Sequence, residues 1–148
     1  MVTKSWFDAF NESRNVIFTD EDFNTYMNDI KQSLPFYRKH LGEHTRILDL
    51  GCGLGVTSVP LSTFGYKIVG IDNDRKVVEA AQTNAERFGA NVEIKYGDIF
   101  DIDKLFEPDS FDVCISGGLL EHFSEDKIRS LIQKQLVISP KLIASMPL

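Results

Sequence analysis

Hydrophobic positions along the chain follow two rhythms, one near the N-terminus and another in the rest of the sequence. Near the N-terminus, apolar side chains recur every three or four residues between Phe23 and Leu41, which predicts one face of a helix. Thr19, followed three residues later by Asp22, is typical of a helix start. Because proline lacks a backbone N–H, we expect Pro35 to kink or break this helix.

From residue 45 onward, short apolar runs alternate with helical patterns. The runs span residues 46–50, 67–71, 92–96, 111–115 and 142–146, and helical patterns follow the first four. The clearest helical pattern covers residues 74–89, where a stripe of valines and alanines ends at Gly89. Strands that are apolar throughout are typical of parallel sheets covered on both faces. We therefore expect an α/β fold with a doubly wound, mainly parallel, Rossmann-like sheet and helices on both faces.

The two patterns of hydrophobic spacing divide a single domain into two parts. Residues 1–44 are expected to form a helical cap or lid, because half of the 16 aromatic residues lie in the first 37 positions. Trp6, Phe7 and Phe10 precede the regular helix and are the lid candidates. The alternative is that the helix simply packs on the sheet. Residues 45–148 are expected to form the ligand-binding core.

Composition narrows the class of protein. The chain has 148 residues, of which 43% are hydrophobic and 26% charged, as in an ordinary globular domain. We find neither an apolar run near the roughly 20 residues that span a bilayer nor a signal-peptide pattern, so a cytoplasmic location without membrane contact is expected. The net charge of −6 and the lack of a Lys/Arg cluster disfavour nucleic acid. We expect Cys52 and Cys114 to be packing residues, and the spacing of histidines and acids predicts no metal site.

Acidic residues follow three of the apolar runs, where the carboxyl ends of parallel strands would meet. Asp49 lies near the end of the first run and precedes alternating glycines, and Asp72 and Asp98 follow the second and third. Ligands of doubly wound sheets bind over the carboxyl ends of the strands, at the point where the strand order reverses. We therefore expect these three acids to share one crevice.

The glycine loop discriminates between two kinds of ligand. The dinucleotide fingerprint G-x-G-x-x-G would need a third glycine where the chain has Val56 or Ser58. Asp49 would also repel a pyrophosphate, by roughly 4 kcal/mol for two unit charges about 4 Å apart at an effective dielectric near 20. S-adenosylmethionine carries an ammonium and a sulfonium with only one carboxylate, which removes this conflict. Asp72 could then accept hydrogen bonds from the ribose hydroxyls, and Asp98 from the adenine amino group.

Four segments in this order and spacing, "ILDLGCGLG", "VGIDND", "IKYGDIF" and "FDVCISGGLLEHF", resemble the successive motifs of class I S-adenosylmethionine-dependent methyltransferases. The resemblance covers about residues 33–147. It implies S-adenosylmethionine as cofactor, with S-adenosylhomocysteine as product. It also implies that Asp49 and the glycine loop hold the methionine end, that the second strand end holds the ribose, and that the third holds the adenine. The implied cofactor contacts are Asp49, Gly51, Cys52, Gly53, Gly55, Asp72, Asn73, Asp98, Ile99, Ser116, Gly117 and Leu119.

Some of these residues have alternative interpretations. His122 follows the fourth apolar run, and histidine is a common general base, but methyl transfer can also rest on proximity and alignment alone. Asp98 could instead stabilise a turn, and Asp49 could accept hydrogen bonds from the amides of its own loop. Asp112 is expected to be structural.

The sequence also departs from the family pattern, because it ends just after the fifth apolar run. Members of the family continue with a helix and two more strands that complete a seven-stranded sheet. We therefore expect a sheet that lacks the last two strands, with an exposed edge through which two copies could pair.

The preferred function is that of a methyltransferase that uses S-adenosylmethionine to methylate an unidentified acceptor, for which the acidic balance favours a small molecule. The alternative is a domain or fragment that binds the cofactor without turnover. An NAD(P)-dependent oxidoreductase is the third, less favoured interpretation.

Overall fold

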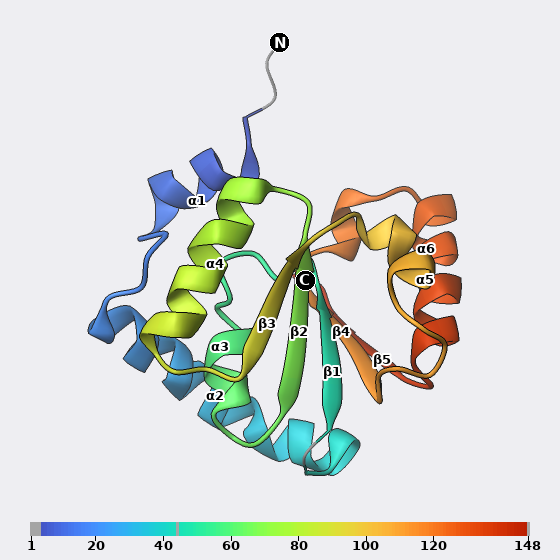
Figure 1. The fold of residues 1–148 in the computed structure, drawn as a ribbon, viewed down its shortest axis with the longest axis horizontal. Coiled ribbons are helices and arrows are strands. Elements are labelled where there is room, and N and C mark those ends of the chain that lie inside the picture. Colours follow the sequence, from blue (N-terminus) through green and yellow to red (C-terminus); the bar gives the residue numbers. More distant parts are fainter. Residues whose placement is uncertain (1–3, 44, 148) are drawn as a thin grey trace.

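Five parallel strands form the centre of the computed structural model, which describes residues 4–43 and 45–147 (Figure 1). The strands are β1 (Arg46–Leu50), β2 (Lys67–Asp72), β3 (Val92–Tyr96), β4 (Val113–Gly117) and β5 (Leu142–Ser145). Their order is β3-β2-β1-β4-β5, and every neighbouring pair is parallel. The chain moves outward from β1 to β3 and then returns to the other side of β1, so the order reverses between β1 and β4. This confirms the predicted doubly wound sheet.

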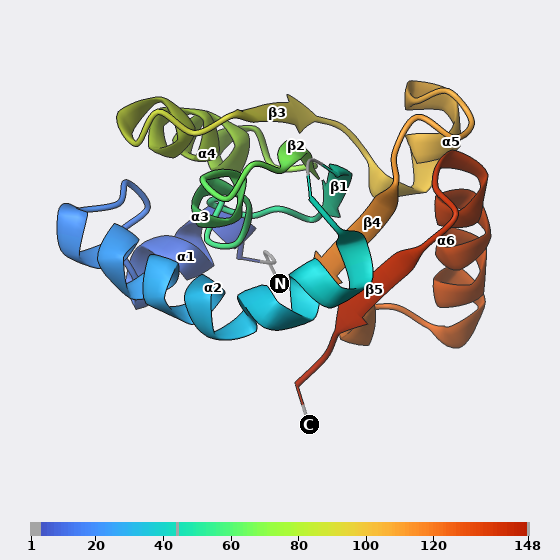
Figure 2. The same cartoon turned by 90° about the horizontal axis from the view of Figure 1, so that it is seen from below.

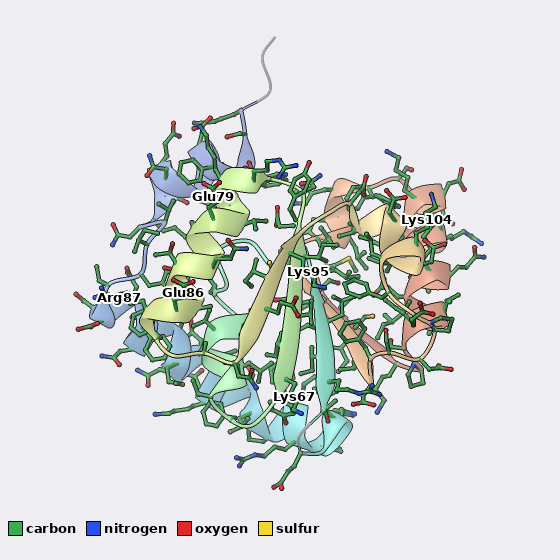
Figure 3. All side chains as sticks on the ribbon, in the orientation of Figure 1. Lys67, Glu79, Glu86, Arg87, Lys95 and Lys104 are labelled. Atoms are coloured by element: carbon green, nitrogen blue, oxygen red, sulfur yellow. The ribbon has the colours of Figure 1, made fainter. Side chains whose placement is uncertain are left out.

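Helices cover both faces of this sheet. They are α1 (Trp6–Ser13), α2 (Asp20–Leu41), α3 (Ser58–Ser62), α4 (Arg75–Arg87), α5 (Ile102–Leu105) and α6 (Glu125–Ile138), with 3₁₀ turns η1 (Ile99–Asp101) and η2 (Leu120–His122). Seen along the strands, α2, α3 and α4 lie on one side of the twisted sheet, and α5 and α6 lie on the other (Figure 2). Charged side chains such as Glu79 and Glu86 of α4 and Lys104 of α5 lie on the outer surface (Figure 3).

Two hydrophobic clusters explain why the strands are apolar throughout. On one face, Leu48 and Leu50 of β1 pack in a cluster with Leu131 of α6. On the other face, Ile47 of β1 packs in a cluster with Leu34 of α2. Because successive side chains of a strand point to opposite faces, a strand that is covered twice needs apolar residues at every position.

Helix α2 shows where local sequence rules hold and where packing overrides them. Thr19 and Asp22 form a capping box at its start, as the spacing predicts. The expected break at Pro35 does not occur, because α2 continues through this residue to Leu41. An internal proline costs about 3 kcal/mol, but the buried residues Ile30 and Leu34 anchor the helix to the sheet at up to about 3 kcal/mol each.

The fourth strand begins two residues later than the apolar run predicts. Phe111 is buried in the core before the strand starts, and β4 extends to Gly117 through pairing with β5. Asp112 accepts hydrogen bonds from the backbone N–H of Arg46 (2.8 Å) and from its Nη2 (3.3 Å), which confirms its structural role. Cys52 and Cys114 are both buried, as expected of packing residues.

Strand β5 forms one edge of the sheet among the described residues, and it pairs with β4 alone. Pairing of this edge with a second copy of the chain stays a prediction. Within residues 4–43 and 45–147, no helix combines the length and the apolar character that crossing a bilayer requires.

Candidate functional site

A cavity of about 820 Å³ opens at the carboxyl ends of the first four strands, beside the point where the strand order reverses. All but two of the predicted cofactor contacts line it, and so does His122. The exceptions are Gly55 and Ser116. Gly55 instead turns the chain into α3, where a Cβ on it would lie 2.8 Å from Val59 Cγ2. Ser116 is buried within β4, where it pairs with Ala144 of β5.

The glycine loop brings bare backbone to the cavity. Gly51 and Gly53 have φ angles of 63° and 55°, a region that residues with side chains rarely adopt. A Cβ on Gly51 would lie 2.9 Å from Leu119 Cδ1, and one on Gly53 would lie 3.4 Å from Phe10 Cζ. Because both glycines line the cavity, their backbone is open to close approach by a ligand.

Asp49 is the penultimate residue of β1, just before this loop, and is 5% exposed. Its carboxylate accepts a hydrogen bond from Ser58 Oγ at 2.5 Å, so its partner is the start of α3 rather than the amides of the loop. Burial raises the pKa of Asp49 to about 7; the Ser58 hydrogen bond opposes this shift, and the nearby charge of Asp72 adds to it. A cationic ligand group would reverse the shift, because an opposite charge favours the ionised carboxylate.

Asp72, at the end of β2, is 9% exposed and holds the same loop from the other side. Its Oδ2 accepts from the N–H of Gly53 and its Oδ1 from the N–H of Asp74, both at 3.1 Å. Burial is the main cause that raises its pKa, and these amide hydrogen bonds oppose the rise. A carboxylate has about four acceptor positions, so each oxygen keeps one for a ligand. Asp72 can therefore accept two hydroxyl groups at once.

Asp98 stabilises a turn, which the sequence allows as an alternative to binding the adenine. It caps η1, and its carboxylate accepts from the N–H of Phe100 at 2.9 Å. It also lines the cavity, together with Ile99 and the loop that follows β4. Its contact with an adenine stays a prediction. The cofactor contact of Asn73 beside Asp72 also stays a prediction, and Asn73 is exposed at the cavity.

Helix α1 contributes residues to the lining of the cavity, whereas α2 packs on the sheet, and the role of α1 as a lid stays a prediction. Trp6 and Phe10 line the cavity, and the Trp6 ring meets the His122 ring edge-on, with 5.1 Å between the ring centroids. Phe7 packs in a cluster with residues of α4, and its N–H donates to Asp74 Oδ2 at 3.3 Å. Figure 1 shows α1 beside α4 at the same end of the sheet as the carboxyl ends of the strands. Two of the three lid candidates therefore face the cavity, and the third attaches the helix.

Asn84 of α4 is a supporting residue that the sequence pattern did not reveal. It is fully buried, and its Oδ1 accepts from the N–H of Phe18 at 2.8 Å. Its Nδ2 donates to the carbonyl groups of Val16 and Leu54, both at 3.0 Å. One side chain thus joins the N-terminal segment and the glycine loop to α4. The available signal was an asparagine within the apolar stripe of this helix.

Two basic residues that line the cavity were not predicted from the sequence either. The guanidinium of Arg14 lies 5.5 Å from the centroid of the Phe10 ring, and Lys127 Nζ lies 6.0 Å from that of Phe100. None of the ion pairs found in the described part of the chain involves Arg14 or Lys127. Isolated basic residues have no motif, so only the fold identifies them.

Comparison with known proteins adds a family to this geometry. Residues 41–144 match the family described as "Methyltransferase domain". The ribosomal protein L11 methyltransferase of Thermosipho africanus is 39% identical over 88 residues, which are 57% of this chain and 34% of that protein. The ubiquinone biosynthesis O-methyltransferase of Rhizobium rhizogenes is 29% identical over 117 residues, which are 78% of this chain and 44% of that protein. The chain therefore spans less than half the length of these curated relatives.

Solved structures agree with the fold. The PH0226 protein from Pyrococcus horikoshii superimposes with a TM-score of 0.76 at 25% identity, covering 97% of this chain and 66% of that one. A protein from Methanosarcina mazei, described as a SAM-dependent methyltransferase, has a TM-score of 0.64 at 28% identity, covering 71% of this chain and 52% of that one.

Proposed function

The chain belongs to the methyltransferase-domain family, and on this premise we propose that it binds S-adenosylmethionine in the cavity and transfers its methyl group to an acceptor. The observation that carries the proposal is Asp72, whose two carboxylate oxygens each keep an acceptor position beside the glycine loop. When bound, the cofactor supplies an electrophilic methyl group on a positively charged sulfur.

The residues present fit this cofactor. Asp72 offers two acceptors to the ribose hydroxyls, and Gly51 and Gly53 allow the backbone close approach. Asp49 has a raised pKa of about 7 and gains its charge most readily next to a cation, which the ammonium of the methionine end provides. The same buried carboxylate disfavours the pyrophosphate of a dinucleotide. The oxidoreductase interpretation is therefore dropped, because both the methyltransferase family and the buried Asp49 argue against a dinucleotide.

For the acceptor, we favour a small molecule. Support comes from the cavity itself, which α1 covers from one side through Trp6 and Phe10. The relatives include enzymes named for ubiquinone biosynthesis and for a ribosomal protein. Because these names point to different acceptors, we base the proposed acceptor class on the cavity.

His122 is proposed to contact this acceptor. It lies at the end of η2, lines the cavity and touches the Trp6 ring. A neutral imidazole there can take the proton that an acceptor hydroxyl or amine must lose. Replacement by glutamine is expected to lower turnover while the affinity for the cofactor changes by less than about threefold, because the cofactor contacts lie on other residues.

Calorimetric titration of S-adenosylmethionine tests the proposed function, with NADH as the control ligand. Asp72→Ala is expected to weaken binding about 100-fold or more, because two hydrogen bonds to a charged acceptor contribute roughly 1.5–3 kcal/mol each. Glu93→Gln removes one negative charge from the exposed face of β3, outside this cavity, and should bind as the wild type does. Binding of NADH in place of S-adenosylmethionine, or equal affinity in Asp72→Ala, would contradict the proposal.

A further inference from the structure

Aromatic side chains line a part of the cavity to which no cofactor contact has been assigned. The ring of Trp6 contacts the ring of His122, and the centroids of the Trp6 and Phe10 rings are 6.3 Å apart. These contacts hold the indole in place, and yet Trp6 is 49% exposed. An aromatic surface that is fixed and still accessible suits a flat ring, which binds through offset or edge-to-face stacking.

The same wall carries positive charge, although the whole chain has a net charge of −6. Arg14 ends α1 and lines the cavity with its guanidinium beside the Phe10 ring. The acids that line the cavity lie at the strand ends, where each already accepts a hydrogen bond from the protein. Glu121 lies near Gly118 but does not line the cavity. Arg14 is therefore available to an anionic ligand, and its planar fork matches a carboxylate.

We infer that the acceptor is an aromatic carboxylate, with its ring against Trp6 and its carboxylate on Arg14. This inference rests on the proposed function, because it assigns the substrate class of the same site. The ring would then lie beside the contacting pair of Trp6 and His122, next to Phe10 and the glycine loop over which Phe10 packs. Arg14 is a binding residue in this arrangement, and His122 contacts the ring of Trp6.

The chain itself contains a probe, since Trp6 is its only tryptophan. We would titrate 4-hydroxybenzoate and its neutral analogue 4-hydroxybenzamide into the protein saturated with S-adenosylhomocysteine, and follow Trp6 fluorescence and heat. The acid is expected to bind at least about tenfold more tightly than the amide, because a charge-assisted hydrogen bond to Arg14 contributes to its binding alone.

Arg14→Gln is expected to remove the advantage of the acid over the amide and to leave the calorimetric affinity for S-adenosylhomocysteine within about twofold of the wild type. The matched control is Arg129→Gln, which removes the same charge from the exposed side of α6. Its affinities for the acid, the amide and S-adenosylhomocysteine should equal those of the wild type.

Two failures are distinguishable. If S-adenosylhomocysteine does not bind the folded wild type, the proposed function and this inference both fail. If it binds but the acid and the amide bind equally, the acceptor is not an aromatic carboxylate. The inference is also overturned if Arg14→Gln weakens the cofactor product as much as the acid, since Arg14 would then belong to the cofactor.

Discussion

Replacing Asp49 with asparagine is expected to stabilise the ligand-free protein at pH 8 and to weaken S-adenosylmethionine binding by about 30-fold or more, the equivalent of about 2 kcal/mol from a lost charged partner. Burial raises the pKa of Asp49 from 3.8 to about 7 in the folded protein. Between these values the folded state holds a proton that the unfolded state has released, so the contribution of Asp49 to stability falls as pH rises through this window. Above pH 7 the full penalty applies, which is at most about 4 kcal/mol for a pKa raised from 3.8 to about 7.

Asparagine avoids this penalty because it carries no charge, and its Oδ1 can still accept from Ser58 Oγ. Urea unfolding of both proteins at pH 5 and pH 8 measures the effect: the advantage of the variant should be clearly larger at pH 8. Asp103→Asn is the control, because its exposed carboxyl has a lowered pKa through the hydrogen bond from Lys134 and should show no such gain. An advantage that is the same at both pH values would exclude a buried carboxyl with a raised pKa.

The second large effect is expected at Asn84. Asn84→Leu keeps the branched shape of the side chain but removes three hydrogen bonds, to the N–H of Phe18 and to the carbonyl groups of Val16 and Leu54. Each buried group that loses its partner costs about 1–3 kcal/mol, so a loss of roughly 3–5 kcal/mol in the free energy of unfolding is expected. Because the same bonds hold the glycine loop and the segment that follows α1, cofactor affinity should also fall.

Denaturant unfolding and calorimetry measure both consequences. Gln82→Leu is the matched control on the same helix, since its exposed side chain makes one hydrogen bond, to the carbonyl of Ile94. Its loss should stay near 1 kcal/mol, the net contribution of one ordinary hydrogen bond. If Asn84→Leu lost no more than this control, the idea that Asn84 fastens the N-terminal segment and the glycine loop would be wrong.

These two residues show opposite uses of a buried polar group. Asn84 is fully paired and supports the shape of the site, whereas Asp49 has a single hydroxyl partner and carries a penalty in the ligand-free protein. Sites that bind charged ligands commonly keep such groups at a cost in stability. The expected gain of Asp49→Asn and loss of Asn84→Leu therefore separate the binding role of Asp49 from the supporting role of Asn84.

The sequence by itself determined the strands, the direction of the sheet and the acids at the strand ends. These features are local: an apolar run buried on both faces gives a parallel strand, and an acid after such a run lies at its carboxyl end. That is why the pattern of apolar runs alone assigns Asp49, Asp72 and Asp98 to one cavity. The capping box of Thr19 and Asp22 follows from local rules in the same way.

Tertiary structure alone decided which distant segments meet. The contact of Trp6 with His122, the hydrogen bonds of Asn84 and the place of Arg14 beside the cavity join residues far apart in the chain, and no local pattern encodes such pairs. Packing also overrode local rules, since α2 continues through Pro35. The physical reason is that a contact between distant segments depends on how whole elements pack, whereas a strand or a cap depends on neighbours a few residues away.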